Sequence, residues 1–441
     1  MQTLFEFFTD PVLMAPTIGS MLMCFVGALV GTFAVLKRVS LISEMLSHAC
    51  YPGVAIALML LSFAPVAELA SHTFALWVML GACLSCALGL FLQFVMKNRF
   101  KIKQDATLTF ILASFFGLAL VLVTSVQNSM PTLYKRMQSY LFGQAATMTM
   151  DHVWLYLALT FFVVCIVCLY GRLMKVSIFD PEFARVNGMN TSFADALLLG
   201  LIVVATVIGI RAVGVVLMSS MIIFPPVCAR LWTDRFIPMI RLSCVFGLVF
   251  GFFGIFFSHT LSITYKTTFA SGPMIVLVAG FVFLVSVLVS KKKGLIVRLS
   301  RRISFWYRCQ QENILKAIWK YAEAGPITLS EVQAIFHENR WIVWLLMSRL
   351  IQRGLCRRTD RRGYVLTASG TRLARKIIRF HRLWEVYLVE YCGVSRDRVH
   401  PSAEEMEHII TPEIELELER LLNDPLYDPH HQRIPPHEVC T

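Results

Sequence analysis

Residues 12–36, VLMAPTIGSMLMCFVGALVGTFAVL, form an uncharged apolar run that is long enough to cross a lipid bilayer as a helix. A hydrocarbon core about 30 Å thick requires roughly 20 such residues. Similar runs follow at about 49–67, 74–96, 106–126, 152–170, 194–210, 212–231, 237–257 and 271–290. We therefore predict that residues 1–290 form an all-α polytopic membrane domain with about nine transmembrane helices. Only Arg211 separates the sixth run from the seventh, so a count of eight or ten is also open.

Composition divides the chain in the same place. The 441 residues are 56% hydrophobic, which is more apolar surface than a single water-soluble core can hide. Lys and Arg number 16 in residues 1–290 and 25 in residues 291–441. The 12 cysteines do not suggest a disulfide framework, because most stand singly in apolar runs. The CxxC pairs Cys83/Cys86 and Cys165/Cys168 are expected to be packing residues.

The basic loops give the membrane domain an orientation, because cytoplasmic loops carry an excess of Lys and Arg. They all fall on one side of the membrane if the N-terminus is outside: Lys37/Arg38, 97–103, 172–185, Arg230/Arg235 and 291–293. We therefore expect a multi-pass protein of the cell inner (cytoplasmic) membrane with a cytoplasmic C-terminus.

The stretch SLISEMLSHACYPG, residues 40–53, places polar groups at the start of the second run. Glu44, Ser47 and His48 would lie on successive helical turns, next to a Pro-Gly pair that is expected to break the helix. Ionisable groups inside a membrane are costly and often mark an ion path. Two interpretations stay open from the residues alone: a transport path, or side chains that satisfy backbone groups at the helix break.

A basic segment with interleaved aromatic residues, KKKGLIVRLSRRISFWYRCQQ (291–311), follows the last run. Such a segment is typical of a juxtamembrane linker that lies against anionic headgroups. Because it is also an accessible and poorly patterned junction, we expect proteolysis to occur there.

The pattern after residue 311 predicts a winged helix-turn-helix DNA-binding domain at 312–378. An amphipathic helix is expected at 312–324, and Thr328 with Glu331 forms a capping box that opens a second helix through about 337. A third helix is expected at 340–353, before a hairpin with strands at about 355–358 and 364–366.

The charge of this region suits a polyanion. Residues 298–382 hold 18 basic and 5 acidic side chains, whereas residues 385–441 hold 4 basic and 13 acidic ones. Arginines of the third helix and the hairpin are candidates for contact with DNA phosphates: Arg340, Arg349, Arg357, Arg358, Arg361 and Arg362. Arginines on a solvated face need no DNA, so that interpretation stays open.

The last part of the chain, 379–441, carries imidazoles and carboxylates at helical spacing. The set consists of His381, Glu385, His400, Glu404, Glu407 and His408. In RVHPSAEEMEHII (398–410) the last four fall at offsets 0, 4, 7 and 8, which would place them on one face of a helix. Imidazole and carboxylate together are ligands of divalent transition metals, so a metal-binding and dimerisation region is predicted.

Over residues 12–290 the chain resembles the permease subunits of ABC-type manganese, zinc and iron importers. The resemblance rests on GTFAVLKRVSLISEMLSHACYPG (31–53), YLFGQ (140–144), FDPEFARVNG (179–188), VLMSSMIIFPPVCARL (216–231) and SGPMIVL (271–277). It implies a separate ATPase subunit, an extracytoplasmic metal-binding protein and a second permease subunit. It also favours the transport path for Glu44, Ser47 and His48. The stretch at 179–188 matches the short helix that docks on the ATPase, through Asp180, Pro181, Glu182 and Arg185.

Over residues 312–436 the chain resembles the diphtheria-toxin-repressor family of metal-dependent DNA-binding proteins. The resemblance rests on ENILKAIW (312–319), RRGYVLTASG (361–370), HRLWE (381–385), RVHPSAEEMEHII and DPLYDPHHQRIPP (424–436). It implies an ancillary metal site at His381, Glu385 and His400, and a primary site at Glu404, Glu407 and His408. It also implies a homodimer on operator DNA, with a divalent metal (iron, manganese or zinc) as corepressor.

This sequence departs from that family at two places. Asn313 and Lys316 stand where manganese sensors carry acidic ligands; Asn313 still offers a neutral oxygen, whereas a charged Lys316 cannot ligate a metal. Trp341 and Trp344 lie in the recognition helix, where small polar residues are usual. The base contacts are therefore expected to differ, or one indole to pack inward.

These patterns support one favoured function and two alternatives. The favoured one is a permease subunit of an ATP-driven importer of iron, manganese or zinc, fused to a metal-dependent repressor of metal-uptake genes that cleavage within 291–311 would release to the cytoplasm. In the second, the tail is a cytosolic metal-responsive gate that does not bind DNA. The third is a membrane-anchored sensor that transports nothing. No enzymatic activity is expected, because the chain has no GxxxxGK[ST] loop and no HExxH order.

Overall fold

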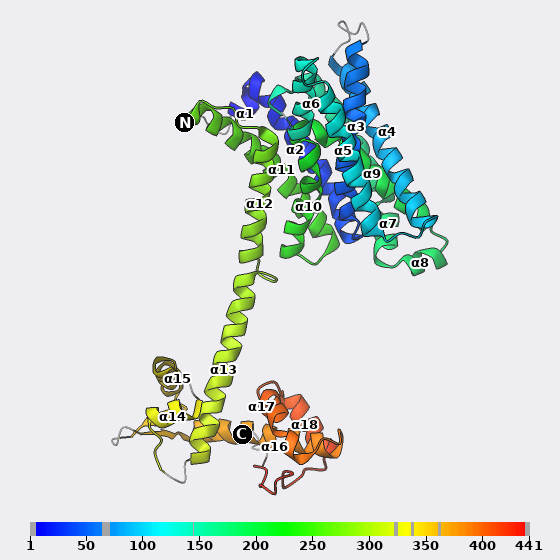
Figure 1. The fold of residues 1–441 in the computed structure, drawn as a ribbon. Coiled ribbons are helices and arrows are strands. Elements are labelled where there is room, and N and C mark those ends of the chain that lie inside the picture. The colour runs from blue at the N-terminus through cyan, green and yellow to red at the C-terminus, as the bar shows by residue number, and fades with distance from the viewer. Residues whose placement is uncertain are drawn as a thin grey trace. The chain divides into compact units, whose positions relative to one another are not determined.

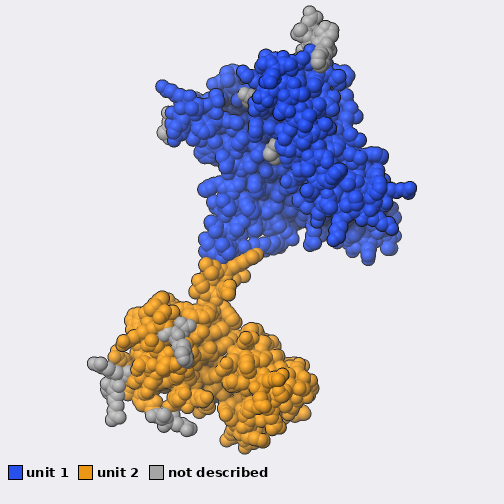
Figure 2. Space-filling view, viewed as in Figure 1, with its two compact units in different colours: residues 1–297 blue, residues 298–441 orange. Residues whose placement is uncertain are grey.

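The computed structural model describes residues 6–63, 71–143, 145–321, 325–336, 339–359 and 363–436. The chain divides into two compact units, Met1–Val297 and Arg298–Thr441, which Figure 2 shows in blue and orange. Each unit has its own apolar core, and each is described by itself.

The first unit is a bundle of helices (Figure 1). Its elements are α1 (Glu6–Thr9), α2 (Pro11–Leu36), α3 (Ser40–Phe63), α4 (Ser71–Asn98), α5 (Gln104–Ser125), α6 (Pro131–Phe142), η1 (Ala145–Thr147), α7 (Met150–Phe179), α8 (Pro181–Val186), α9 (Thr191–Val213), α10 (Val215–Trp232), α11 (Phe236–Tyr265) and α12 (Ser271–Val289). Within the described residues, eight helices are long and apolar enough to cross a membrane, and Leu217–Trp232 of α10 is a shorter apolar helix. The predicted polytopic all-α fold is confirmed.

Helix α2 lies at the centre of this bundle. It packs against α7, α9, α10 and α11, and its buried residues include Met23, Val26 and Phe33. Helix α2 is apolar on nearly all sides, so its composition suits lipid and protein equally, and it is the packing of the surrounding helices that buries it. The bundle therefore encloses the first apolar run of the sequence instead of exposing it.

The predicted helix break at residues 52–53 is wrong. Helix α3 continues from Ser40 to Phe63 with Pro52 inside it. The reason lies at Gly53, where a Cβ atom would come within 2.1 Å of the carbonyl oxygen of Gly81 on α4. The glycine lets two helices approach closely and does not form a turn. Small residues commonly have this role in membrane bundles.

The boundary between α9 and α10 also differs from the prediction. Helix α9 continues past Arg211 to Val213, and the break falls at Gly214, whose φ of 92° is in the region that favours glycine. A Cβ atom there would lie 2.5 Å from the backbone nitrogen of Gly143 and from the carbonyl oxygen of Leu141. The break is therefore set by packing against the end of α6, which a hydropathy pattern does not contain.

The second unit begins with a long helix and continues with a winged helix-turn-helix. Its elements are α13 (Leu295–Tyr321), α14 (Leu329–Phe336), α15 (Arg340–Gln352), β1 (Cys356–Arg358), β2 (Tyr364–Leu366), α16 (Ala368–Glu390), η3 (Arg396–Arg398), α17 (His400–Met406) and α18 (Pro412–Leu421). Strands β1 and β2 pair antiparallel, with Cys356 opposite Leu366. Ile314 and Ile318 of α13 share a buried cluster with Leu346 and Leu350 of α15.

Helix α13 starts earlier than the helix that the sequence predicted at 312–324. It begins at Leu295, so most of the basic segment after the last membrane run is helical. Within that segment, Leu295, Leu299 and Ile303 recur at helical spacing and are exposed, as are the arginines between them. Only 291–294 remain outside a helix. The early start follows from this spacing, since apolar residues that recur every three or four positions favour an amphipathic helix.

Candidate metal centre and nucleic-acid interface

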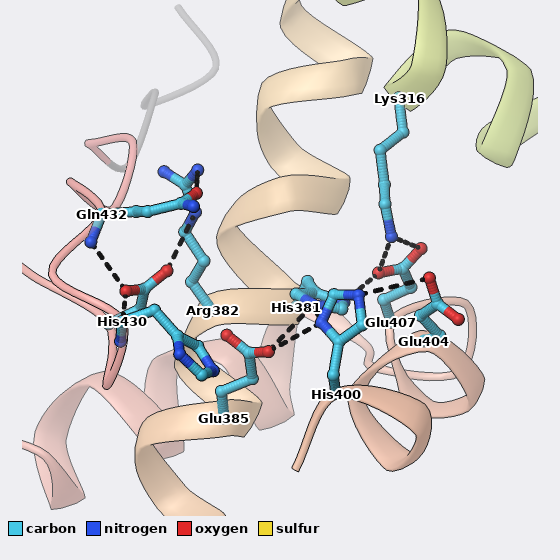
Figure 3. A network of polar contacts seen from close by, with 10 residues as sticks. Lys316, His381, Arg382, Glu385, His400, Glu404, Glu407, His430 and Gln432 are labelled. Carbon is cyan, nitrogen blue, oxygen red and sulfur yellow. Dashed lines mark hydrogen bonds and ion pairs between the residues drawn. The ribbon is translucent and has the colours of Figure 1, made fainter. Parts of the chain in front are cut away.

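Two helices of the second unit carry the candidate metal ligands. Thr367 caps α16, with its Oγ1 accepting a hydrogen bond from the backbone N–H of Gly370 at 3.1 Å. His381 and Glu385 follow one turn apart on the buried face of this helix. His400 is the first residue of α17, which packs against α16. Figure 3 shows the three side chains pointing toward one another.

His381, Glu385 and His400 form a cluster in which one donor atom of each lies within 4.8 Å of the others. His381 Nε2 is 3.2 Å from Glu385 Oε1 and 3.0 Å from His400 Nδ1. His400 Nδ1 is 3.0 Å from the same Glu385 oxygen. The first two residues are buried, whereas His400 is exposed and leaves one side of the cluster open. Two imidazole nitrogens and one carboxylate oxygen fit a divalent transition metal.

The cluster is electrostatically balanced by its own residues. Burial lowers the pKa of His381, but hydrogen bonds to Glu385 and Glu407 outweigh burial and bring the pKa above its ordinary value. Burial raises the pKa of Glu385, but hydrogen bonds from His381 and His400 outweigh it and bring the pKa below its ordinary value. The carboxylate is therefore ionised at neutral pH and available to a cation.

The other three predicted ligands are not in this cluster. Helix α17 ends at Met406, and Glu407 is its C-cap, still in the right-handed helical region with its backbone N–H bonded to the carbonyl oxygen of Ala403. The predicted face therefore continues to Glu407, but its side chains reach different partners. Glu404 is exposed, and its carboxylate lies 3.6 Å from His400 Nε2. His408 Nδ1 lies 2.6 Å from a carboxylate oxygen of Glu312 on α13.

Glu407 is buried and already has two partners. Both of its carboxylate oxygens accept hydrogen bonds from Lys316 Nζ at 2.9 Å, and its Oε2 lies 2.6 Å from His381 Nδ1 (Figure 3). Asn313 is half-buried on the same helix as Lys316, and the structure records no side-chain contact between it and these groups. Sequence reasoning did not identify Glu312 as a partner. The signal available was its position one helical turn before Lys316.

The nucleic-acid candidates lie on the exposed side of the winged domain. Trp341 and Trp344 are 65% and 57% exposed on α15, so neither indole packs inward. The arginines at these elements are also exposed: Arg340 and Arg349 on α15, and Arg357 and Arg358 on β1. Arg361 and Arg362 lie outside the described residues. The arginines and tryptophans of α15 and β1 thus form an exposed surface. The contacts of the described residues include no acidic partner for these arginines.

The candidate transport residues lie on α3 in the first unit. Ser47 is buried and donates to the carbonyl oxygen of Ser43 at 2.8 Å. The ring of His48 stands edge-on to Phe116, with centroids 4.8 Å apart, and its Nδ1 is buried without a hydrogen-bond partner among the described residues. Glu44 is half-buried one turn before His48. An imidazole nitrogen without a partner is costly in a protein interior.

The candidate docking segment forms the short helix α8. Its first turn is capped by Asp180, whose Oδ1 accepts from the backbone N–H of Phe183 at 2.9 Å. Pro181, Glu182 and Arg185 are exposed, and Ala184 is the buried residue of this helix. The segment thus presents most of its side chains outward.

Comparison with known proteins agrees with both halves of this description. Residues 9–290 match the ABC 3 transport family. Residues 367–436 match the metal binding and dimerisation domain of iron dependent repressors. A Chlamydia trachomatis protein named "Probable metal transport system membrane protein" is 34% identical over 97% of this chain and 97% of its own length.

Two further relatives cover the membrane unit. The "Zinc transport system membrane protein TroC" of Treponema pallidum is 33% identical over 68% of this chain and 97% of its own. The solved structure of PsaBC from Streptococcus pneumoniae in complex with Fab is 23% identical, has a TM-score of 0.56, and covers 66% of this chain and 96% of that one. At that identity the structure supports the fold of the membrane unit. The chain belongs to the ABC 3 transport family, as a metal permease fused to a metal-dependent repressor domain.

Proposed function

We propose that the membrane unit is a permease subunit of an ATP-driven importer of a divalent transition metal: iron, manganese or zinc. A separate ATPase subunit would dock at α8, an extracytoplasmic protein would deliver the metal, and a second permease subunit would complete the channel. The exposed, capped helix α8 and the polar residues of α3 support this proposal. The loop charges support an inner-membrane location with a cytoplasmic C-terminus.

The second unit would act as a metal-dependent repressor of metal-uptake genes and would bind operator DNA as a homodimer. The cluster of His381, Glu385 and His400 carries this proposal, because it joins two helices through a donor set that fits a metal. A bound ion would supply a cation that draws these side chains together. Any state in which all three donors converge is then favoured over states in which they do not.

A repressor tethered to the membrane can reach little of a chromosome, so we also propose that cleavage within 291–311 releases the second unit. Because α13 begins at Leu295, the non-helical part of this interval is 291–294. Cleavage is expected there, since a helix must unfold before a protease can cut it and these residues already lie outside a helix. Immunoblots of native cells that show only the full-length chain would remove this part of the proposal.

The proposal is tested by gel retardation with the full-length chain in detergent and DNA from upstream of the transport genes. Manganese, ferrous iron and zinc are added in turn. Arg357→Ala with Arg358→Ala is expected to weaken retardation and to lower the slope of log K against log salt by about 2, because each phosphate contact contributes roughly 0.9. Metal binding should not change in this variant.

Arg396→Ala is the matched control, because Arg396 is an exposed arginine in η3, away from the wing. Retardation of this variant should equal that of the native chain. If the native chain never retards DNA at any metal concentration while the cluster still binds metal, the second unit is a gate on the transporter and not a repressor.

A further inference from the structure

The contact between Lys316 and Glu407 bears on how many metal ions the second unit holds. We propose that Lys316 is a built-in cation that replaces a second metal ion, so that the unit holds one ion, at His381, Glu385 and His400. Glu407 would then be a positioning residue for His381 and not a ligand. This inference rests on the proposed metal-sensing function of the same site.

The first step is the occupancy of Glu407. Its carboxylate is fully buried, and Lys316 Nζ lies 2.9 Å from each of its two oxygens. A metal ion needs at least one of these oxygens with a lone pair directed at it. A cation placed there would also meet the ammonium at close range in a buried setting, where like charges repel most strongly. The ammonium therefore strongly disfavours a metal ion at Glu407.

The second step is the state of the neighbouring groups. His408 Nε2 is 3.7 Å from Glu407 Oε1, but its Nδ1 is held 2.6 Å from Glu312 on α13. Glu404 is exposed and reaches toward His400 instead. The three residues that would make a second site thus face three different partners. Among the described contacts, only the one of 3.7 Å between His408 and Glu407 joins two of them, and Glu404 contacts neither.

The third step is the role left for Glu407. His381 Nδ1 lies 2.6 Å from Glu407 Oε2, which is a hydrogen bond if Nδ1 carries the proton. The other ring nitrogen, Nε2, then faces Glu385 and His400, where the cluster lies. A carboxylate that fixes the tautomer and orientation of a metal-binding imidazole in this way typically changes metal affinity 10- to 100-fold.

The same contacts connect the cluster to the winged domain. His381 contacts Glu407, and Glu407 contacts Lys316 on α13. Two residues on either side of Lys316, α13 contributes Ile314 and Ile318 to the buried cluster that holds α15. The built-in cation therefore holds the metal-binding helices against the DNA-binding core without needing a second ion.

The test counts zinc ions bound to the full-length chain in detergent, by equilibrium dialysis and elemental analysis. Glu385→Gln should bind one ion fewer than the native chain. Lys316→Glu, which replaces the ammonium with a carboxylate, should bind one ion more. Lys320→Glu, the same reversal at an exposed position one turn later on α13, should not change the count. Glu407→Gln should keep the native count but weaken zinc binding about 10- to 100-fold.

Two results would overturn the inference while leaving the sensor intact. The first is a Glu407→Gln chain that binds one zinc ion fewer than the native chain. The second is a folded Lys316→Glu chain that binds the same number of zinc ions as the native chain. If that variant does not fold, Lys316→Met removes the ammonium without adding charge and should also bind one additional ion. A count that Glu385→Gln leaves unchanged would instead refute the proposed metal site itself. Ions held by the membrane unit are common to all variants and cancel in the differences.

Discussion

At the scale of single residues, the C-terminal region is held by buried charges that are all paired. Arg379 is 4% exposed, and its guanidinium contacts Glu415 at 3.3 Å and Glu419 at 2.6 Å. Arg382 lies 3.4 Å from the buried Asp428, which also accepts from the backbone N–H of Gln432. The apolar clusters here are small. Removing one partner of a buried pair leaves the other uncompensated, which is strongly destabilising.

Arg379→Leu is therefore expected to destabilise the second unit by roughly 3–5 kcal/mol, because it leaves Glu415 and Glu419 without their cation. Arg372→Leu is the control on the same helix, and its exposed side chain predicts a change within about 0.5 kcal/mol. Both changes in stability are measured by unfolding the full-length chain in denaturant, with cleavage of the second unit by a protease as the readout. Equal effects of the two substitutions would contradict this account.

The metal cluster shows what residue spacing can and cannot predict. His381 and Glu385 are four residues apart on one helix, so the sequence alone places them together. His400 is brought to them by packing of α17 on α16, which only a family resemblance indicated. Glu407 was expected to bind metal because its offset suits a helix, and it does follow at helical geometry as the C-cap of α17. Its carboxylate is instead held by Lys316 and His381, partners that spacing alone does not predict.

At the scale of elements, the start of α14 is fixed by a capping box that the sequence predicted. The backbone N–H of Thr328 donates to Glu331 Oε2 at 2.7 Å, and the backbone N–H of Glu331 is 3.4 Å from Thr328 Oγ1. The hydrogen bonds from the backbone and the side chain of Thr328 lower the pKa of Glu331. The carboxylate is therefore stabilised in its charged form by the folded helix.

This lowered pKa predicts an acid-sensitive contribution to the stability of α14. Because the folded pKa lies below the unfolded value of about 4.3, the contribution is complete above that value and is lost as the pH falls through the folded pKa. Glu331→Ala should therefore be less stable than the native chain at pH 7, and the difference should shrink as the pH falls below about 4. Thermal unfolding at several pH values measures it. A difference that does not depend on pH would show that the carboxylate charge is not involved.

Most membrane helices were predictable because each is a long apolar run with polar ends. Helix α6 (Pro131–Phe142) was not, since it is short and carries Lys135 and Arg136. The helix break predicted at Pro52-Gly53, inside α3, and the boundary of α9 predicted at Arg211 were also wrong. In both cases the decisive contact is a glycine against a distant backbone, and a single sequence does not show which backbones approach each other.

At the scale of the whole molecule, two compact units with different chemistry share one chain. The transport proposal depends only on the first, and the DNA-binding proposal depends only on the second. Substitutions in one unit should therefore leave the other function intact. This separation allows the competing functions to be distinguished within a single protein.

Glu44→Ala and His48→Ala are expected to reduce uptake of radioactive manganese or zinc to the level of cells that lack the chain. The physical reason is that both remove polar groups from α3 inside an otherwise apolar bundle. Metal-dependent DNA retardation should be unchanged. Asp105→Asn, at an exposed position at the start of α5, is the control that alters a carboxylate without touching α3. Uptake that is the same in native cells, in the two α3 variants and in cells that lack the chain would support a sensor that transports nothing.

The contact at Gly53 and Gly81 has a mechanical consequence. With Ser85 Oγ also donating to the carbonyl oxygen of Ala49 at 2.6 Å, α3 and α4 interlock at backbone distance. Neither helix can slide or rotate along the other without steric overlap, so the two should move as one rigid body during any inward-to-outward transition. The hinge points would then lie outside this pair of helices, and the distances from residues 44–48 to α4 would stay constant throughout the cycle.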